Sequence, residues 1–316
     1  MEVLPPKKSV NQKVNLPFLE KAGVELYIKR EDLLHRHISG NKYRKLFYNL
    51  MQARREGHHT LLTFGGAFSN HIAATAYAVR LAGMKSIGVI RGDELGKDLQ
   101  KTLKENPTLR FAVAQGMQLH FVSRRNYRKK TEPSFREHLH DLFGDFYWVP
   151  EGGTNHLAVK GAAEILTQND QTFDVITCAV GTGGTIAGLI NASFPHQQIF
   201  GFPALKENYL ENNIKKYTAK TNWQLIRDYH LGGFAKVSPE LIRFINDFHA
   251  RTNILLDPVY TAKMMMGLQN MIKKGFFQRG TKILAIHTGG LQGIDGMNIH
   301  LKKKGLPLIR TAFYQD

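Results

Sequence analysis

The sequence predicts an α/β protein in which parallel-rich, twisted sheets are flanked by helices on both faces, a three-layer α/β/α arrangement. Short apolar or β-branched runs alternate with longer helical patterns, several runs end in glycine clusters, and no repeat or low-complexity segment interrupts the alternation. The clearest runs are residues 61–64, 86–90, 175–180 and 283–286. Because 316 residues exceed one minimal domain, we expect one or two α/β domains.

The first informative stretch is residues 38–46, ISGNKYRKL, where a tight Gly-Asn turn leads into a helix. Lys42 and Lys45 are three residues apart and share a helix face, while Leu46 and Leu50 face the core. A neighbouring positive charge and a helix N-terminus both lower the pKa of a lysine, which suits a lysine that forms a Schiff base. The alternative interpretation is a solvated basic helix face.

Glycines follow several of the predicted strands, at residues 65–66, 152–153, 181–184 and 289–290. Ligands of open α/β sheets bind at the carboxyl ends of the strands. We therefore expect these glycines to line one crevice. Taken singly, each cluster is equally well explained by a tight turn that needs positive φ.

The cluster with the strongest chemical signal is Gly181-Thr182-Gly183-Gly184-Thr185, between an apolar strand and an apolar helix. Converging backbone N–H groups, a helix N-terminus and threonine hydroxyls make such a loop an anion cradle, and a phosphate monoester would fit it. The loop lacks the Gly-Lys-Ser/Thr of a Walker A motif and the third glycine of the dinucleotide fingerprint. A plain strand-to-helix turn is the alternative.

The net charge of +17 and the sequence pI of 9.8 invite a nucleic-acid interpretation, and residues 124–130, RRNYRKK, form the strongest basic run. The other basic residues are spread along the chain, and a basic enzyme also attracts small anionic substrates. We therefore expect no nucleic-acid partner.

A single cysteine, Cys178, excludes an internal disulfide framework and fits a reducing compartment, and its mid-strand position indicates a small buried hydrophobe. No apolar run approaches the length of a membrane span, so we expect a cytoplasmic protein without membrane contact. His58 and His59 lack metal-ligand spacing, and we expect no metal.

These motifs resemble those of the pyridoxal-phosphate enzymes of fold type II, and within them the family of 1-aminocyclopropane-1-carboxylate deaminase and D-cysteine desulfhydrase. The resemblance spans nearly the whole chain and rests on residues 39–46, 65–71, 181–185, 257–260 and 287–290. It implies pyridoxal 5'-phosphate as cofactor, a small amino acid as substrate, and a homodimer.

The same resemblance implies two domains. Residues 1–44 and 152–316 would form the large cofactor-binding domain, and residues 45–151 would form a smaller inserted α/β domain. Composition alone does not reveal this boundary.

The resemblance also implies a role for each site residue. Lys42 would be the Schiff-base lysine, Lys45 a phosphate contact, and Asn70 a neighbour of the pyridine ring. Ser69 would bind the substrate carboxylate, and Lys42, Ser69 and Tyr260 would be the catalytic residues. The other expected cofactor contacts are Thr288 and the phosphate loop, Gly181, Thr182, Gly183, Gly184 and Thr185. The other expected substrate contacts are Asn70, His71, Phe234 and Tyr260.

Each of these side chains also has a purely structural interpretation. Tyr260 could pack between domains, and Ser69 with Asn70 could cap the helix that follows. His71 and His287, taken alone, are more typical of core histidines with satisfied hydrogen bonds.

The sequence departs from the family pattern at three positions. Thr261 stands where the deaminases have a glutamate that keeps the pyridine nitrogen protonated, and Thr288 stands where they have an apolar residue. Phe234 replaces a tyrosine that the family usually has, so one hydroxyl near the substrate is missing.

These departures bear on the reaction. An electron sink next to Cα would let Lys42 remove the Cα proton of D-cysteine, with loss of thiolate from Cβ and release of pyruvate and ammonia. Aminocyclopropane carboxylate has no Cα proton, and its ring opening needs a charged partner on the pyridine nitrogen, since charged hydrogen bonds are roughly twice as strong as neutral ones. Thr261 and Thr288 supply only hydroxyls, which favours β-elimination. Ring-opening deamination, racemisation and nucleic-acid binding are the alternatives.

Overall fold

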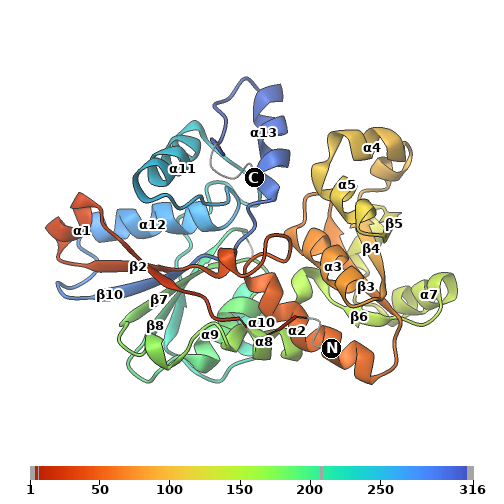
Figure 1. Ribbon diagram of the computed structural model, residues 1–316, viewed down its shortest axis with the longest axis horizontal. Coiled ribbons are helices and arrows are strands. Elements are labelled where there is room, and N and C mark those ends of the chain that lie inside the picture. Colours follow the sequence, from red (N-terminus) through yellow and green to blue (C-terminus); the bar gives the residue numbers. More distant parts are fainter. Residues whose placement is uncertain (1–3, 6, 207–208, 312–316) are drawn as a thin grey trace.

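The computed structural model describes residues 4–5, 7–206 and 209–311, and the predicted large domain therefore begins and ends outside the described part. The strands described form two separate sheets, seen left and right in Figure 1. The six-stranded sheet has the order β1 (Asn11–Val14), β2 (Glu25–Lys29), β10 (Lys282–Ile286), β7 (Val175–Val180), β8 (Gln198–Pro203) and β9 (Trp223–Leu225). The four-stranded sheet has the order β5 (Met117–Val122), β4 (Lys85–Arg91), β3 (Thr60–Gly66) and β6 (Tyr147–Val149).

Every strand pair is parallel except β1 with β2, so the predicted parallel-rich sheets are confirmed. The four apolar runs predicted as strands lie within β3, β4, β7 and β10. Strand β7 shows why such runs read as continuously apolar. All six of its residues are buried, because Val175 and Ala179 pack on one face of the sheet while Ile176 and Cys178 pack on the other. The predicted burial of Cys178 is confirmed.

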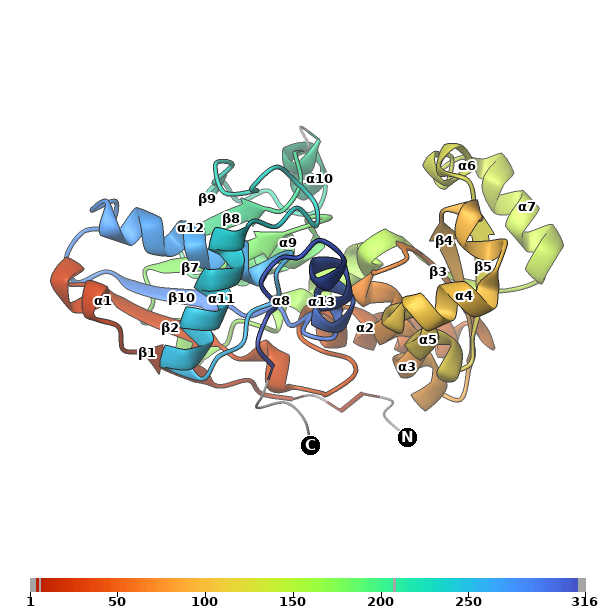
Figure 2. The same ribbon diagram turned by 90° about the horizontal axis from the view of Figure 1, so that it is seen from above.

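Helices cover both faces of each sheet (Figures 1 and 2). One face of the six-stranded sheet carries α1 (Pro17–Ala22), α11 (Pro239–Thr252), α12 (Thr261–Lys273) and α13 (Gly293–Lys303), and the other carries α8 (His156–Ala163), α9 (Gly184–Ala192) and α10 (Leu210–Lys215). The four-stranded sheet lies between α2 (Asn41–Arg55), α3 (Asn70–Leu81) and α5 (Pro107–Ala114) on one side and α6 (Arg124–Arg128) and α7 (Pro133–Phe143) on the other. Helix α4 (Leu99–Glu105) precedes α5, and the short 3-10 turns are η1 (Glu31–Leu33), η2 (Asp93–Gly96), η3 (Glu151–Gly153) and η4 (Gln168–Asp170).

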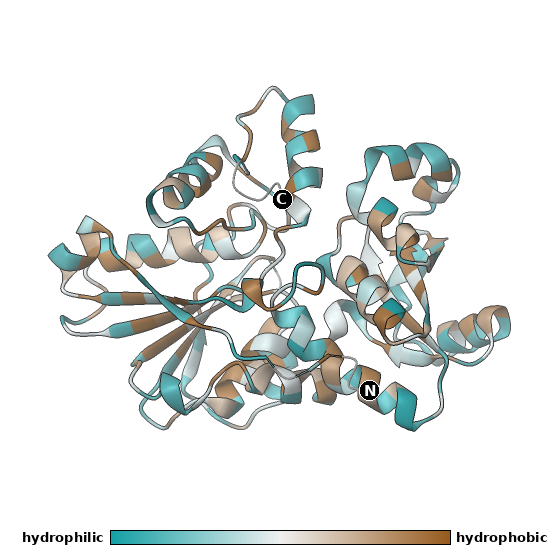
Figure 3. Ribbon diagram, viewed as in Figure 1, coloured by the Kyte–Doolittle hydropathy of each residue, from teal (hydrophilic) through white to brown (hydrophobic). Residues whose placement is uncertain are grey.

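Hydropathy follows these layers. Figure 3 shows hydrophobic residues along the central strands and a largely hydrophilic α4 at the periphery. No helix in the described ranges has the length and apolar character needed to cross a membrane.

Helix α2 connects the two sheets. Leu46 and Leu50 are completely buried in the core under the four-stranded sheet, as predicted. On the opposite side α2 packs against α8, and a Cβ at Gly161 would collide with the carbonyl group of Arg44. The helix runs without a break through residues 44 and 45, so the predicted domain boundary coincides with no interruption of secondary structure.

Candidate active site

The start of helix α2 is held by hydrogen bonds to the loop after β10 and to the first turn of α9. Its N-cap residue Gly40 has a φ of 62°, and a Cβ there would collide with the carbonyl group of Thr288. The Asn41 N–H donates to that carbonyl oxygen (3.2 Å), and the Asn41 side-chain amide donates to Thr185 Oγ1 (2.7 Å). The predicted Gly-Asn turn thus fixes α2 against the loop that follows β10 and against the first turn of α9.

Lys42 lies in the first turn of α2, with Nζ 3.2 Å from Asn41 Oδ1. Burial lowers the pKa of Lys42 to about 8, against an opposing effect of the Asp257 carboxylate. Burial also holds the pKa of Lys45 well below its usual range, and repulsion from Lys42 is the next cause. The pKa of Lys42 is lowered as expected, but exclusion of water lowers it, whereas repulsion between the two lysines lowers the pKa of Lys45.

Lys45 points at the glycine-rich segments. Its Nζ donates to the carbonyl oxygen of Gly152 (2.7 Å) and to Thr154 Oγ1 (2.9 Å), and Thr154 Oγ1 lies 2.5 Å from Thr182 Oγ1. A Cβ added at Gly184 would lie 2.8 Å from the Thr154 side chain and 3.2 Å from Lys45 Cε. Two glycine segments and a buried lysine therefore meet, and the space between them admits no further side chain.

The loop from Gly181 to Gly183 joins β7 to α9 in the predicted strand-loop-helix order. Gly183 is the N-cap of α9, has a φ of 92° and provides no side-chain cap. The first N–H groups of a helix have no intrahelical partner, and the helix dipole makes this end positive. With Lys45 beside it, this end of α9 is suited to an anionic group such as a phosphate.

The loop between β3 and α3 approaches from the four-stranded sheet. Ser69 is the N-cap of α3, and its Oγ accepts from the N–H of Ile72 (3.4 Å), which confirms the capping interpretation. A Cβ at Gly290 would lie 2.5 Å from the Asn70 amide, and one at Gly293 would lie 3.3 Å from the Asn70 oxygen. Asn70 therefore lies against Gly290, in the loop after β10, and against Gly293, at the start of α13.

His71 forms its hydrogen bonds with residues of β3 and α3, on the side of the four-stranded sheet. Thr63 donates its hydroxyl to the carbonyl oxygen of Val149 (2.9 Å), so it accepts from His71 Nε2 (2.8 Å), and Nδ1 accepts from Thr75 (3.3 Å). Burial, followed by the charges of the two nearby lysines, holds the pKa of His71 well below its usual range, and the ring is neutral. This arrangement matches the core-histidine interpretation and leaves both ring nitrogens occupied.

Asp257 organises the start of α12. The buried carboxylate accepts from the N–H groups of Val259 (3.0 Å), Tyr260 (3.1 Å) and Thr261 (2.7 Å), and from the Thr261 hydroxyl (2.8 Å). A Cβ at Gly181 would lie 3.2 Å from the Tyr260 ring, so the phenol lies over the glycine-rich loop. Burial, then the Asp257 charge, raises the pKa of Tyr260, which keeps its hydroxyl protonated.

The remaining predicted residues lie at different depths. Phe234 is 43% exposed, and its ring meets the Tyr260 ring edge-on with centroids 6.1 Å apart. Thr288 is almost fully buried beside the start of α2. His287 donates from Nε2 to the Leu255 carbonyl (2.7 Å) and accepts at Nδ1 from the N–H of Gly289 (3.2 Å), so it is a core histidine.

Sequence reasoning missed the roles of two residues. Thr154 connects Lys45 to Thr182, and Asp257 supports both Tyr260 and Thr261. An aspartate just before a helix is a recognisable capping signal, so Asp257 could have been found. Thr154 carries no such signal, because its neighbours are distant in sequence.

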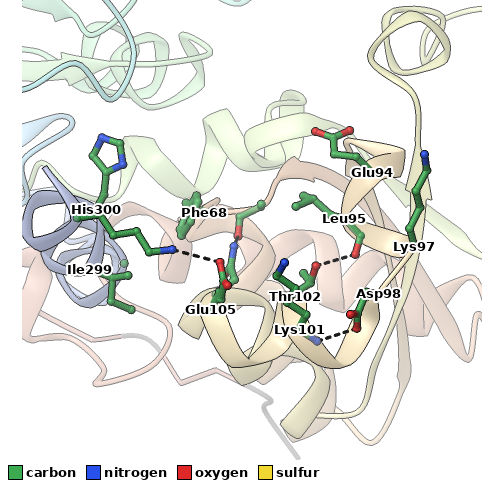
Figure 4. Close-up of a pocket in the computed structure, with 14 residues that line it drawn as sticks. Phe68, Glu94, Leu95, Lys97, Asp98, Lys101, Thr102, Glu105, Ile299 and His300 are labelled. Carbon is green, nitrogen blue, oxygen red and sulfur yellow. Dashed lines mark hydrogen bonds and ion pairs between the residues drawn. The ribbon is translucent and has the colours of Figure 1, made fainter.

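An open cavity of about 440 Å³ adjoins the loop that carries Ser69 (Figure 4). It lies between α13 and the η2–α4 segment, and the Lys303–Glu105 ion pair (3.2 Å) crosses it. Phe68 lines the cavity and is 53% exposed. The cavity gives solvent a route to the outside of the Ser69 loop.

The basic run at residues 124–130 is partly neutralised within the fold. The Tyr127 hydroxyl donates to Glu151 (2.9 Å), and Lys130 forms an ion pair with the same carboxylate (3.3 Å). Arg124 pairs with Glu94 (2.6 Å). The run therefore helps to fix η3, which carries the Gly152 carbonyl that Lys45 contacts.

Comparisons with known proteins identify the family of this chain. The family model described as pyridoxal-phosphate dependent enzyme matches residues 9–289. A Thermotoga maritima protein whose provisional name is 1-aminocyclopropane-1-carboxylate deaminase is 34% identical over 297 residues, covering 87% of this chain and 91% of its own. An Arabidopsis thaliana protein named bifunctional D-cysteine desulfhydrase/1-aminocyclopropane-1-carboxylate deaminase, mitochondrial, is 32% identical over 305 residues, covering 89% of this chain and 75% of its own.

A solved structure of an ACC deaminase homologue superposes with a TM-score of 0.76 at 30% identity, covering 95% of this chain and 94% of that one. Serine racemase from Dictyostelium discoideum superposes with a TM-score of 0.63 at 16% identity, covering 90% and 92% of the two chains, which shows a shared fold alone.

Proposed function

We propose that this chain, which belongs to the pyridoxal-phosphate-dependent enzymes, cleaves D-cysteine by β-elimination. Within these enzymes it belongs to the 1-aminocyclopropane-1-carboxylate deaminase/D-cysteine desulfhydrase family. D-cysteine and water would yield pyruvate, hydrogen sulfide and ammonia. The observation that carries the proposal is the half-buried Lys42, whose pKa is lowered to about 8 by desolvation, beside a glycine cradle, with Thr261 in place of a carboxylate residue at the start of α12.

The residues present fit pyridoxal phosphate. Lys42 supplies an amine whose pKa is lowered to about 8 by burial, as covalent attachment to an aldehyde requires. Lys45, the threonine hydroxyls and the first N–H groups of α9 would hold the phosphate, and a Cβ at residue 184 would collide with Thr154 and press on Lys45. The bound cofactor supplies an electron sink next to the substrate Cα.

The protein's own groups would do the rest. Nζ of Lys42 would take the Cα proton, because a pKa near 8 leaves part of the amine neutral at physiological pH. Ser69 and the N-terminus of α3 would bind the substrate carboxylate. The Tyr260 phenol, kept protonated by burial and by Asp257, would provide a proton to the departing sulfur.

Ring-opening deamination is the second candidate, and one contact favours it. The Thr261 hydroxyl donates to the Asp257 carboxylate (2.8 Å). A buried carboxylate is therefore in contact with a position at which the sequence indicates only a hydroxyl group. We rank it below β-elimination because that carboxylate already accepts three backbone N–H groups and the Thr261 hydroxyl.

Product identification tests the proposal. Purified protein loaded with pyridoxal phosphate is incubated separately with D-cysteine, L-cysteine and 1-aminocyclopropane-1-carboxylate, and the keto acid is identified by mass spectrometry. Pyruvate and sulfide from D-cysteine would support it. Formation of 2-oxobutyrate from the cyclopropane, with no pyruvate from either cysteine, would establish ring opening instead.

Three further proposals accompany this function. The domains divide at residues 44/45 and 151/152, in line with the separate sheets on either side of these positions. The protein is a homodimer, as the family resemblance implies, and light scattering of the holoenzyme tests this. It acts in the cytoplasm, which its single buried cysteine favours.

A further inference from the structure

The segment from Tyr229 to Lys236 is a strained loop that leads to the active site. Leu231 and Ala235 have φ values of 50° and 54°, a region that side chains with a Cβ rarely adopt. Gly232 and Gly233, also at positive φ, lie between them. A conformation of this kind persists only when surrounding contacts hold it in place.

One side chain provides such contacts. Lys263 is 2% exposed, and its Nζ donates to the carbonyl oxygens of His230 (2.9 Å) and Gly233 (2.7 Å). Burying an ammonium group is costly unless hydrogen bonds compensate. Both of these acceptors are backbone carbonyls of the loop, so the loop and the buried lysine stabilise each other.

Helix α12 contacts the loop at three successive turns. Tyr260 at its N-cap meets the Phe234 ring, Lys263 one turn later binds the two carbonyls, and Gly267 a further turn on lies under Tyr229. A Cβ at Gly267 would lie 2.6 Å from that ring. Residues 260, 263 and 267 share one helix face, so the helix that presents Tyr260 also fixes the loop that presents Phe234.

We propose that Lys263 is a positioning residue that holds Phe234 against Tyr260 and thereby sets the aromatic wall of the substrate site. The proposal rests on the proposed function in one respect, namely that Tyr260 faces the substrate. Lys263 acts through its bonds to the loop carbonyls of His230 and Gly233. Without it, the loop would leave its left-handed conformation and the Phe234 ring would lose its fixed position.

The test compares Lys263→Met, which keeps the length and removes the donors, with Lys263→Arg, which keeps charge and donors. Lys274→Met is the matched control, because Lys274 lies exposed just beyond the same helix. In the holoenzyme, hydrogen exchange of residues 229–236 should accelerate roughly tenfold or more in Lys263→Met and stay near the wild-type rate in Lys263→Arg and Lys274→Met. Unchanged exchange in Lys263→Met would overturn the proposal.

Kinetics provide a second readout. Lys263→Met should raise KM about fivefold or more with kcat within about twofold and with unchanged visible absorbance of the bound cofactor. Phe234→Leu should raise KM similarly, and the double variant should match the single ones, because both changes act through one ring. Additive effects would indicate a general structural role and would contradict the proposal.

Two features keep the outcome interpretable. Hydrogen exchange needs no substrate. A protein inactive on D-cysteine would therefore refute the proposed function, while the exchange data would still test the role of Lys263. If Lys263→Met does not fold, Lys263→Gln retains amide donors. Its loop exchange should then be faster than that of wild type and Lys274→Met, and exchange equal to wild type would reject the role of the ammonium group.

Discussion

The two sides of the site differ in how firmly their polar groups are held. On the side of the glycine-rich loop 181–185, Lys45, Asp257 and Thr261 are buried and form hydrogen bonds of 2.7 to 2.9 Å, Lys45 with Gly152 and Thr154 and Asp257 with Thr261. On the side of the four-stranded sheet, Phe68 is more than half exposed and the Ser69 cap is a long 3.4 Å contact.

This difference matches two kinds of ligand. A cofactor that stays bound benefits from a pre-organised network, because satisfied polar groups in a water-poor site interact strongly. A substrate that enters and leaves in each turnover needs access to solvent and groups that can exchange partners. Changes on the first side should therefore alter cofactor retention, and changes on the second should alter KM.

The largest effect should follow Lys42→Ala. Removing the amine removes both covalent attachment and the proton acceptor, so keto-acid formation should fall by about two to four orders of magnitude. Borohydride reduction followed by peptide mass spectrometry should trap the cofactor on residue 42 in wild type only. Cofactor trapped on Lys45 instead would reverse the assignment of the two lysines.

Matched glycine substitutions compare the two sides directly. In Gly184→Ala the new Cβ would lie 2.8 Å from Thr154, and overpacking of about 1–3 kcal/mol should weaken cofactor binding roughly 5- to 150-fold by equilibrium titration. In Gly66→Ala the nearest atom is the Arg91 side chain at 3.5 Å, so cofactor affinity should change little. Equal losses in the two variants would remove the distinction between the sides.

The sequence predicts the secondary structure around the site better than the hydrogen bonds within it. The four apolar runs, the turn before Lys42 and the helix after Gly183 follow from local patterns, and the structure confirms them. The contact of Lys45 with Thr154 joins residues 109 apart in sequence, which no local periodicity encodes. Burial of Lys42 depends on the whole fold, so the main cause of its pKa shift could not be derived from its neighbours.

The pH dependence of cofactor capture tests whether the cofactor side of the site is desolvated at Lys42. Only the neutral Lys42 amine attacks an aldehyde, so the capture rate of cofactor-free protein should rise roughly tenfold per pH unit up to about 8 and then level off. Stopped-flow absorbance measures it. A rate that keeps rising to the usual lysine pKa of 10.5 would show that Lys42 is not desolvated.

The same shift links stability to pH. The folded-state pKa of Lys42 lies below the usual 10.5, so between about 8 and 10.5 the unfolded chain binds more protons than the folded one. The unfolding free energy of cofactor-free protein should therefore rise with pH in this window. The slope should decrease in Lys42→Met without vanishing, because burial also lowers the pKa of Lys263 to about 8. Denaturant titrations at several pH values provide the measurement.

A smaller effect is expected for the capping serine on the substrate side. Ser69→Ala should cost about 1 kcal/mol of unfolding free energy and should also raise KM about fivefold. Ser238→Ala removes an equivalent cap at the start of α11, where Oγ accepts from the N–H of Leu241 (3.3 Å). It should lose similar stability with unchanged KM, and a matching KM increase would assign the Ser69 effect to capping alone.

The smallest effect should follow Phe234→Tyr, which restores the hydroxyl that the family resemblance leads one to expect. The Phe234 ring is 43% exposed and meets Tyr260 edge-on, so the new hydroxyl can reach water without leaving a buried polar group unpaired. The unfolding free energy should change by less than about 0.5 kcal/mol. The ratio of pyruvate formed from D-cysteine to 2-oxobutyrate formed from the cyclopropane should stay within about threefold of wild type. A tenfold shift of that ratio would mean that the missing hydroxyl, rather than Thr261 and Asp257, selects the reaction, and the exposed side of the site would then govern chemistry as well as KM.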